Sequence, residues 1–308
     1  MSRLFGIAGV QMSVKPWDMD GTIEKMSDVA LNIHKQFPWI GMVVYHELVV
    51  PGLVQFKTPV DMDWWKKNSG PVPSAHTDRL CELARKTKQW LIPGSLWETE
   101  GDKMYNTALV ISPDGDIVAK YRKMFPWMPY EMGATPGNEF CVFDIPNVGR
   151  FGLCICYDMW FPETARTLAW MGAEVIIQPT LTPTSDRPLE LVMARANALF
   201  NQCYFVSVNG VGEWGGGRST IIDPDGRILQ EAGTNQTFMS EMIDLDHTTR
   251  TREYGTLGLA QTLKQLRDSG HKFPIYGNQS VSTEGFKQLG KLGFHRNSGL
   301  PVQNSLDT

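Results

Sequence analysis

The stretch FGLCICYDMWFPE, residues 151–163, joins an apolar strand to a reactive side chain. The apolar run reaches Cys156, and we expect a helix to begin near Pro162. A thiol at a strand-to-turn junction, close to backbone N–H groups and a cation, has a lowered pKa and becomes a nucleophile. Alternation places Cys154 on the same face but away from the strand's end, so we interpret it as an inert buried thiol. Cys156 is therefore the candidate nucleophile.

Two further segments place a charged side chain where a buried strand meets a loop. In VVYHELVVPG, Glu47 follows an otherwise uncharged strand, so we expect a partly buried carboxylate with the raised pKa that a general base requires. In KYRKMFPWMPYEMG, alternation puts Arg122 and Lys123 on opposite faces, and a buried lysine beside a carboxylate can stabilise an oxyanion. Each segment alone has an ordinary interpretation: a glutamate in water or in an ion pair, and a solvated strand edge.

The histidines do not suggest a partner for the thiol. His46 adjoins Glu47, but it would point to the opposite face of an extended segment. A Cys-His arrangement is therefore disfavoured, although residues that are distant in sequence can be neighbours in space.

Strand-like and helix-like segments alternate along the chain. Short apolar runs rich in β-branched residues predict buried strands at residues 7–10, 42–45, 90–93, 108–111, 151–155, 175–178 and 204–208. Helical periodicity predicts helices at residues 22–36, 74–88, 162–171 and 189–201. This alternation indicates an α/β architecture.

Two hairpin-like segments resemble each other. TALVISPDGDIVAKY, around Pro113, and RSTIIDPDGRILQEA, around Pro224, each read as a strand, a Pro-Asp-Gly turn and a second strand. The chain could therefore hold two related halves, although such turns are common and the likeness alone leaves the question open.

Composition excludes several classes of protein. The 308 residues are 42% hydrophobic and 20% charged, and 29 Lys and Arg nearly balance 33 Asp and Glu. The net charge of -4 and the lack of a basic run argue against nucleic acid. No apolar stretch reaches the 18 or so residues that span a bilayer, so we expect no membrane association and a cytoplasmic location.

The cysteines and histidines do not indicate a cofactor. Five cysteines in a chain of this size are expected to be reduced thiols. The one close pair, Cys154 and Cys156, has C-x-C spacing, and the six histidines are scattered, so no metal site is expected.

Three motifs follow one another along the chain: a glutamate after a strand (Glu47), Y-R-K at residues 121–123 and C-Y-D-x-x-F-P-E at residues 156–163. Together and in this order, they resemble the nitrilase superfamily of carbon-nitrogen hydrolases. The resemblance runs from about residue 4 to about residue 246, and includes Y-N-T-A at residues 105–108, R-A-x-A at residues 195–198, and Asn209. It implies a four-layer αββα sandwich of two pseudo-related halves.

Within that superfamily, KYRKMFPWMPYE is similar to the aliphatic amidase and formamidase branch, in which a second glutamate recurs eight positions after the lysine; the match assigns Glu131. Tyr157 and Asp158 follow the nucleophile, whereas nitrilases usually carry C-W-E, so the resemblance favours amides over nitriles. The chain departs from the pattern in having His46 where most members have proline. Tyr157 also resembles the broader amidase and carbamoyl-hydrolase branches.

The resemblance implies a cysteine-dependent amidase without a cofactor. Its implied catalytic residues are Glu47, Lys123, Glu131 and Cys156. Their neighbours Trp127, Tyr157 and Trp160 are candidate substrate-binding residues, and a bulky Trp127 favours a small acyl group unless Gly52 and Gly133 open space.

The expected substrate is a small aliphatic amide, cleaved by water to a carboxylic acid and ammonia through a thioester. Alternatives are an N-carbamoyl amine or amino-acid amidohydrolase, a nitrilase, and a non-catalytic module with the same fold. For the carbamoyl alternative, Arg187 is either an anchor for the distal substrate group or a surface charge.

We expect a catalytic domain over residues 1–262 and a C-terminal extension over residues 263–308. After about residue 278 few large apolar residues remain, as expected of a tail outside the core. The resemblance implies a homo-oligomer, a dimer or larger, on whose neighbouring subunit the extension could pack.

Overall fold

The structure is a computed structural model that describes residues 2–51, 62–128, 131, 133–212, 215–273 and 276. Within these residues, no helix is both long enough and apolar enough to cross a membrane.

The first sheet is built mainly by the N-terminal half. Its strands follow the order β15-β1-β2-β3-β5-β4, and β6 also pairs with β5. Strands β1, β2 and β3 are parallel, whereas β15 runs antiparallel to β1 and β5 runs antiparallel to β3, β4 and β6. The bounds are β1 Leu4–Gln11, β2 Ile40–Tyr45, β3 Trp90–Ile92, β4 Ser95–Glu100, β5 Lys103–Ile111, β6 Ile117–Arg122 and β15 Thr237–Asp244.

The second sheet repeats this plan, with strand order β14-β13-β10-β9-β8-β7. Strands β8, β9 and β10 are parallel, and β7 and β13 flank them antiparallel. The bounds are β7 Cys141–Ile145, β8 Gly149–Leu153, β9 Val175–Thr180, β10 Tyr204–Asn209, β13 Thr220–Ile222 and β14 Ile228–Glu231. A small ribbon joins β11 Val211–Gly212 to β12 Gly215–Gly216.

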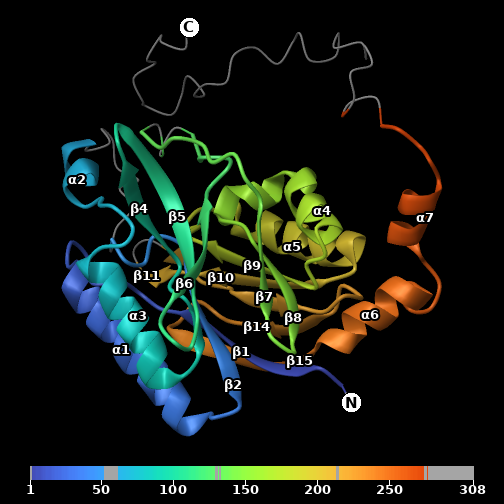
Figure 1. Ribbon diagram of the computed structural model, residues 1–308, viewed down its shortest axis with the longest axis horizontal. Helices are drawn as coiled ribbons and strands as arrows, with labels where there is room; N and C mark the ends of the chain where they lie inside the picture. Colours follow the sequence, from blue (N-terminus) through green and yellow to red (C-terminus); the bar gives the residue numbers. More distant parts are fainter. Residues whose placement is uncertain are drawn as a thin grey trace, which may run out of the picture.

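Helices cover the outer face of each sheet (Figure 1). One apolar cluster fills the space between the two sheets, a second joins the first sheet to α1 and α3, and a third joins the second sheet to α4 and α5. The predicted αββα sandwich is therefore confirmed. The helices are α1 Met19–Gln36, α2 Met62–Lys67, α3 Ala75–Thr87, α4 Pro162–Trp170, α5 Arg187–Asn201, α6 Leu245–Tyr254 and α7 Thr262–Asp268, with a 3-10 helix at Cys156–Trp160.

Local sequence explains where these helices begin. The Asp18 side chain accepts a hydrogen bond from the Gly21 N–H at the start of α1, and Ser74 forms a capping box with Thr77 at the start of α3. Pro162 occupies the first turn of α4, where its missing N–H has no cost.

The two Pro-Asp-Gly turns occupy matching places and have the same geometry. The backbone N–H of Ser112 bonds to Asp116 O, as that of Asp223 bonds to Arg227 O. The turn glycines have left-handed φ values of 79° and 77°, which glycine adopts without strain. Each turn follows a unit in which helices connect three parallel strands, and this shared plan confirms the two related halves.

Every predicted strand and helix overlaps an observed element. The predictions at residues 90–93, 74–88 and 162–171 extend one residue past one or both ends, and the larger error is at the nucleophile. The predicted strand at residues 151–155 ends at Leu153. Cys154 packs toward α4 and α5, whereas Cys156 joins the cluster between the sheets, so the two thiols do not share a face. The alternation fails because the backbone is still extended at Ile155 but turns at Cys156, whose φ of 46° is left-handed.

The predicted division of the chain remains a prediction. Its boundary at residues 262 and 263 falls at the beginning of α7, whose residues are not buried. Most of the proposed extension, residues 277–308, lies outside the described residues, as does Gly52.

Candidate active site

Cys156 lies at a sharp corner of the backbone. Its φ of 46° is in the left-handed region, which costs energy for a residue with a Cβ and often marks functional sites. The Asp158 carboxylate holds the corner by accepting a hydrogen bond from the Ile155 N–H at 2.9 Å. On the other side, the Gln178 side chain donates to Cys156 O at 3.0 Å. The corner therefore presents the thiol in a fixed position.

Asp158 also ties this corner to the loop that follows β6. Its carboxylate accepts hydrogen bonds from the Tyr121 hydroxyl at 2.7 Å and from the Phe125 N–H at 2.9 Å. Burial raises the pKa of Asp158 to about 6, although the charge of Lys123 and the hydrogen bonds that Asp158 accepts favour its charged form. The Asp158 side chain thus fixes the loop that carries Lys123 relative to the nucleophile.

Lys123 directly follows β6 and lies between two carboxylates. Its Nζ is 2.8 Å from Glu47 Oε1 and 2.6 Å from Glu131 Oε2, and only 2% of the lysine is exposed. The preceding residue, Arg122, points the other way and pairs with Glu98 and Glu100, as alternation predicts. The structure therefore brings Lys123 together with both predicted glutamates.

Asn106 completes this cluster, and sequence reasoning did not select it as a site residue. Its Nδ2 donates to Glu47 Oε1 and to Glu131 Oε1, both at 2.8 Å, and its backbone carbonyl accepts from the Lys123 N–H. The available signal was the asparagine of the Y-N-T-A segment on a buried strand, because a buried amide requires hydrogen-bond partners. Asn106 positions the two carboxylates around the lysine.

The buried charges shift one another's pKa. Burial raises the pKa of the Glu47 carboxyl, and the charge of Glu131 adds to this effect against the opposing charge of Lys123. Burial alone would lower the pKa of Lys123, but the two carboxylates outweigh it and hold that pKa well above its usual value. The cluster therefore combines a firmly cationic lysine with a glutamate suited to exchanging protons.

The Cys156 thiol contradicts the prediction that its pKa is lowered. Burial raises the pKa of Cys156 well above its usual value, and the Glu47 carboxylate raises it further, against the smaller effects of Lys123 and Thr180. The sequence suggested a nearby cation but could not show that the thiol is 7% exposed and adjoins a carboxylate. Cys156 therefore rests as a neutral thiol, and its attack requires a base to take the proton. Glu47 is in hydrogen-bond contact with it.

A narrow pocket opens on Cys156. Its empty space is about 230 Å³. All three predicted substrate-binding residues, Trp127, Tyr157 and Trp160, contribute to its wall. The remaining lining residues are Leu181, Thr182, Asp186 and Glu190, which the sequence did not select.

Arg187 is neither a surface charge nor an anchor in this pocket. It is 2% exposed and pairs through Nη1 with Glu190 Oε2 at 2.9 Å. Both alternatives failed for the same physical reason: the glutamate one helical turn later draws the guanidinium into a buried ion pair.

His46 is buried behind Glu47. One ring nitrogen, Nδ1, lies 2.8 Å from Glu47 O. Burial lowers the pKa of His46 to about 4, so the ring is neutral near neutral pH and Nδ1–H donates to the carbonyl. His46 thus fixes the backbone that carries the candidate base.

The neutral state of His46 makes stability depend on pH. As the pH falls from about 6.5 toward about 4, an unfolded histidine binds a proton that the folded one does not, so stability decreases. The difference between the pKa values of His46 in the unfolded and folded states corresponds to about 3 kcal/mol in the free energy of unfolding. Urea unfolding of the wild type and of His46→Asn, which retains a donor near Nδ1, should show the wild type losing this much more stability over that range. Parallel pH profiles for the two proteins would contradict this assignment.

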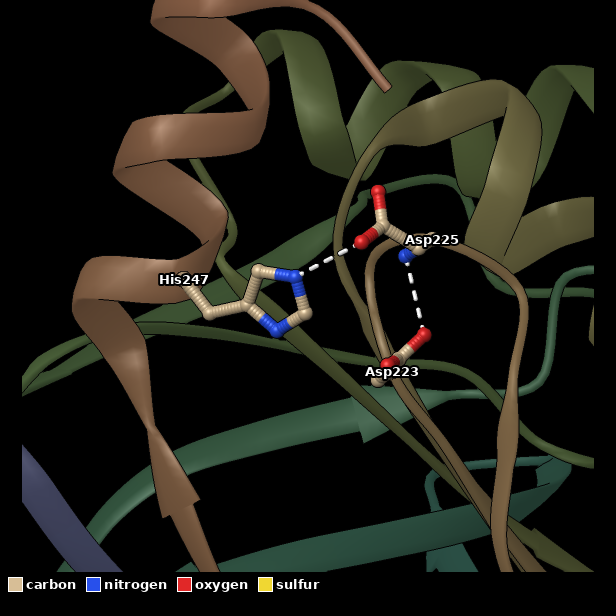
Figure 2. A group of neighbouring side chains, drawn as sticks. All are labelled: Asp223, Asp225 and His247. Carbon is tan, nitrogen blue, oxygen red and sulfur yellow. Dashed lines mark hydrogen bonds and ion pairs between the residues drawn. The ribbon is translucent and has the colours of Figure 1, made fainter. Parts of the chain in front are cut away.

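One group of side chains has the composition of a metal site. Asp223, Asp225 and His247 bring their ligand atoms within 4.8 Å of one another, the only such group found in the described parts of the chain. Figure 2 shows His247 reaching from α6 to the turn, where its Nε2 is 3.0 Å from Asp225. Asp223 Oδ1 accepts from the N–H groups of Asp225 and Arg227, as the Ser112 hydroxyl does in the first turn. The group is thus explained as a brace of the turn.

The αββα fold and the Glu-Lys-Glu-Cys cluster define a nitrilase-type hydrolase. The sequence profile of the carbon-nitrogen hydrolase family matches residues 6–253, and the chain belongs to this family. It is an amidase-type hydrolase that acts on carbon–nitrogen bonds other than peptide bonds.

Individual relatives agree with this assignment. The chain is 31% identical to omega-amidase NIT2 of Mus musculus over 215 residues, which are 64% of this chain and 77% of the relative. It is 29% identical to a formamidase of Bacillus cereus strain B4264 over 223 residues, 71% of this chain and 66% of the relative. The structure of Saccharomyces cerevisiae Nit3 matches with a TM-score of 0.72 at 28% identity, covering 81% of this chain and 93% of Nit3. An amidase from Nesterenkonia sp. shares the fold, with a TM-score of 0.69 at 24% identity over 82% of this chain and 94% of the amidase.

Proposed function

We propose that this chain hydrolyses small aliphatic amides to carboxylic acids and ammonia through a thioester on Cys156. The observation that carries the proposal is the convergence of Glu47, Lys123, Glu131 and Cys156, from four separate segments, beside one small pocket. The relatives named omega-amidase and formamidase support an amide as the substrate.

In the first half of the cycle, Glu47 takes the proton of Cys156 as sulfur attacks the amide carbonyl carbon. The developing oxyanion is stabilised by the Lys123 ammonium and by the backbone N–H of Tyr157, each donor being worth about 2.7 to 4 kcal/mol of barrier. Glu47 then gives the proton to the leaving nitrogen. The C–N bond breaks, ammonia departs, and the acyl group remains on sulfur.

In the second half, water attacks the thioester. Glu47 removes a proton from the water, the same donors hold the second oxyanion, and the C–S bond breaks to release the acid. The proton on Glu47 returns to the thiolate. Glu131, bonded to Lys123, orients the lysine in both halves.

The size of the pocket favours a short acyl group. Its empty space of about 230 Å³ includes the open mouth, and three aromatic side chains narrow it. A formyl, acetyl or propionyl group fits these dimensions better than a long chain.

A substrate panel separates the proposed function from its alternatives. Ammonia release should be fastest with formamide, acetamide or propionamide, and slower with N-carbamoyl amines, N-carbamoyl amino acids and nitriles of matched size. Faster turnover of a carbamoyl compound or of a nitrile would show that this class of compound, and not the amides, is the substrate. Turnover of no compound would favour a non-catalytic binding module.

We also propose a homodimer or larger assembly, supported by an apolar stripe on α5. Val192 and Phe200 lie on this outer helix with 67% and 58% of their surface exposed, and Trp170 of α4 is 54% exposed. Large exposed apolar patches commonly mark interfaces between proteins. The C-terminal extension is a further candidate for contact with a neighbouring subunit, and the free thiols agree with a cytoplasmic location.

Val192→Glu should therefore reduce the particle mass measured by light scattering, because an unpaired charge would be buried in the interface. Leu31→Glu is the control: Leu31 is an exposed apolar residue on α1, in the opposite helical layer, and its replacement should leave the mass unchanged. An unchanged particle mass for Val192→Glu would show that this stripe is not part of the interface between subunits.

A further inference from the structure

The pocket beside Cys156 has an unbalanced carboxylate in its wall. Asp186 precedes α5 and is half-buried, so it belongs to the outer part of the pocket, above the buried thiol. Its side chain accepts a hydrogen bond from the Thr184 hydroxyl and caps no N–H group of the helix. Among the described residues, no Lys, Arg or His forms an ion pair with Asp186. Its charge is therefore available to a molecule in the pocket.

The second carboxylate in the wall, Glu190, is neutralised. Arg187 pairs with one of its oxygens at 2.9 Å, and the Thr182 hydroxyl donates to the other at 3.0 Å. Arg187 Nη2 donates to the Ser207 hydroxyl and to Arg218 O, so both terminal nitrogens of this guanidinium are bonded. Glu190 therefore shapes the inner wall without adding a free charge.

The lining contains no cation that could balance Asp186. In the part of the chain that the structure describes, the pocket wall has two carboxylates and no Lys, Arg or His. The nearest catalytic cation, Lys123, is held between Glu47 and Glu131. An anionic substrate group would meet only negative charge, whereas a cationic group would gain a partner at Asp186.

We propose that Asp186 determines specificity by favouring short primary amides whose far end is a cation, such as an ammonium group, over amides that end in a carboxylate. This inference rests on the proposed amide hydrolysis. It assigns the inner pocket to the scissile amide and the outer wall at Asp186 to the distal end of the substrate. Uncharged amides of the same length should lie between the two.

Three amides of equal chain length test the inference near neutral pH. β-Alaninamide ends in an ammonium group, butyramide in a methyl group, and succinamate in a carboxylate. We expect kcat/KM to fall in that order, with a difference of about tenfold or more between the first and the last. The Asp186→Asn variant should bring the three values close together, because it removes the charge that distinguishes them.

Two further variants serve as controls. Asp186→Glu keeps the charge and should keep the order of the three amides, whereas Asp114→Asn removes an exposed carboxylate outside the pocket and should change nothing. Equal turnover of the three amides by the wild type, or an unchanged order in Asp186→Asn, would overturn this inference alone. Turnover of none of the three, butyramide included, would overturn the proposed function as well.

Discussion

Cys156→Ala is expected to abolish amide hydrolysis, a loss of about 10⁴-fold or more in kcat, because no other group can form the acyl intermediate. The expectation follows from the position of the thiol at the backbone corner, in contact with Glu47 and at the floor of the pocket. Removing one buried sulfur should cost the fold only about 1 kcal/mol. Steady-state ammonia release and thermal unfolding measure the two effects separately.

Cys154→Ala is the matched control. Cys154 is also a buried thiol, two positions earlier, but it packs toward α4 and α5 and does not line the pocket. This variant should lose comparable stability and keep its turnover. A Cys156→Ala protein that still hydrolyses amides at the wild-type rate would overturn the nucleophile assignment.

Glu47→Gln is expected to lower kcat by about 10²- to 10⁴-fold, because both halves of the cycle lose their proton acceptor. The replacement is nearly isosteric, and the side-chain oxygen can still accept from Asn106. It leaves Lys123 and Glu131 as a balanced pair in place of one cation between two carboxylates. The free energy of unfolding should therefore stay the same or increase while activity falls.

Glu98→Gln is the control that distinguishes the loss of a catalytic group from the loss of a buried charge. Glu98 is a buried carboxylate that pairs with Lys120 and Arg122 at 2.6 and 2.9 Å, but it lies outside the pocket. Glu98→Gln should reduce stability and leave kcat within a few-fold of the wild type. A Glu47→Gln protein that is unstable yet fully active would instead make Glu47 a structural residue.

Much of the fold could be predicted because its signals are local. The apolar runs and helical periods located the buried strands and the four main covering helices, and the Pro-Asp-Gly turns suggested two related halves. The error at Cys154 and Cys156 has a physical cause. Alternation assumes an extended backbone, and no sequence feature announces a cysteine with a left-handed φ of 46°.

The site was predicted less completely, because it depends on distances between segments. The four candidate catalytic residues came from ordered motifs, and the structure places them together. The raised pKa of Cys156 depends on burial and on the nearby Glu47 carboxylate, neither of which a single motif contains. Asn106 and Asp186 were missed for the same reason, since each gains its role only from groups distant in the sequence.

Mass spectrometry of the enzyme during turnover tests the central claim most directly. Wild-type protein mixed with excess propionamide, quenched in acid and digested should yield the peptide that contains Cys156 with one added propionyl group. Hydroxylamine should remove that group, as expected of a thioester, and Cys156→Ala should not acquire it. A propionyl group on any other residue, or an acylated Cys156→Ala protein, would contradict the account.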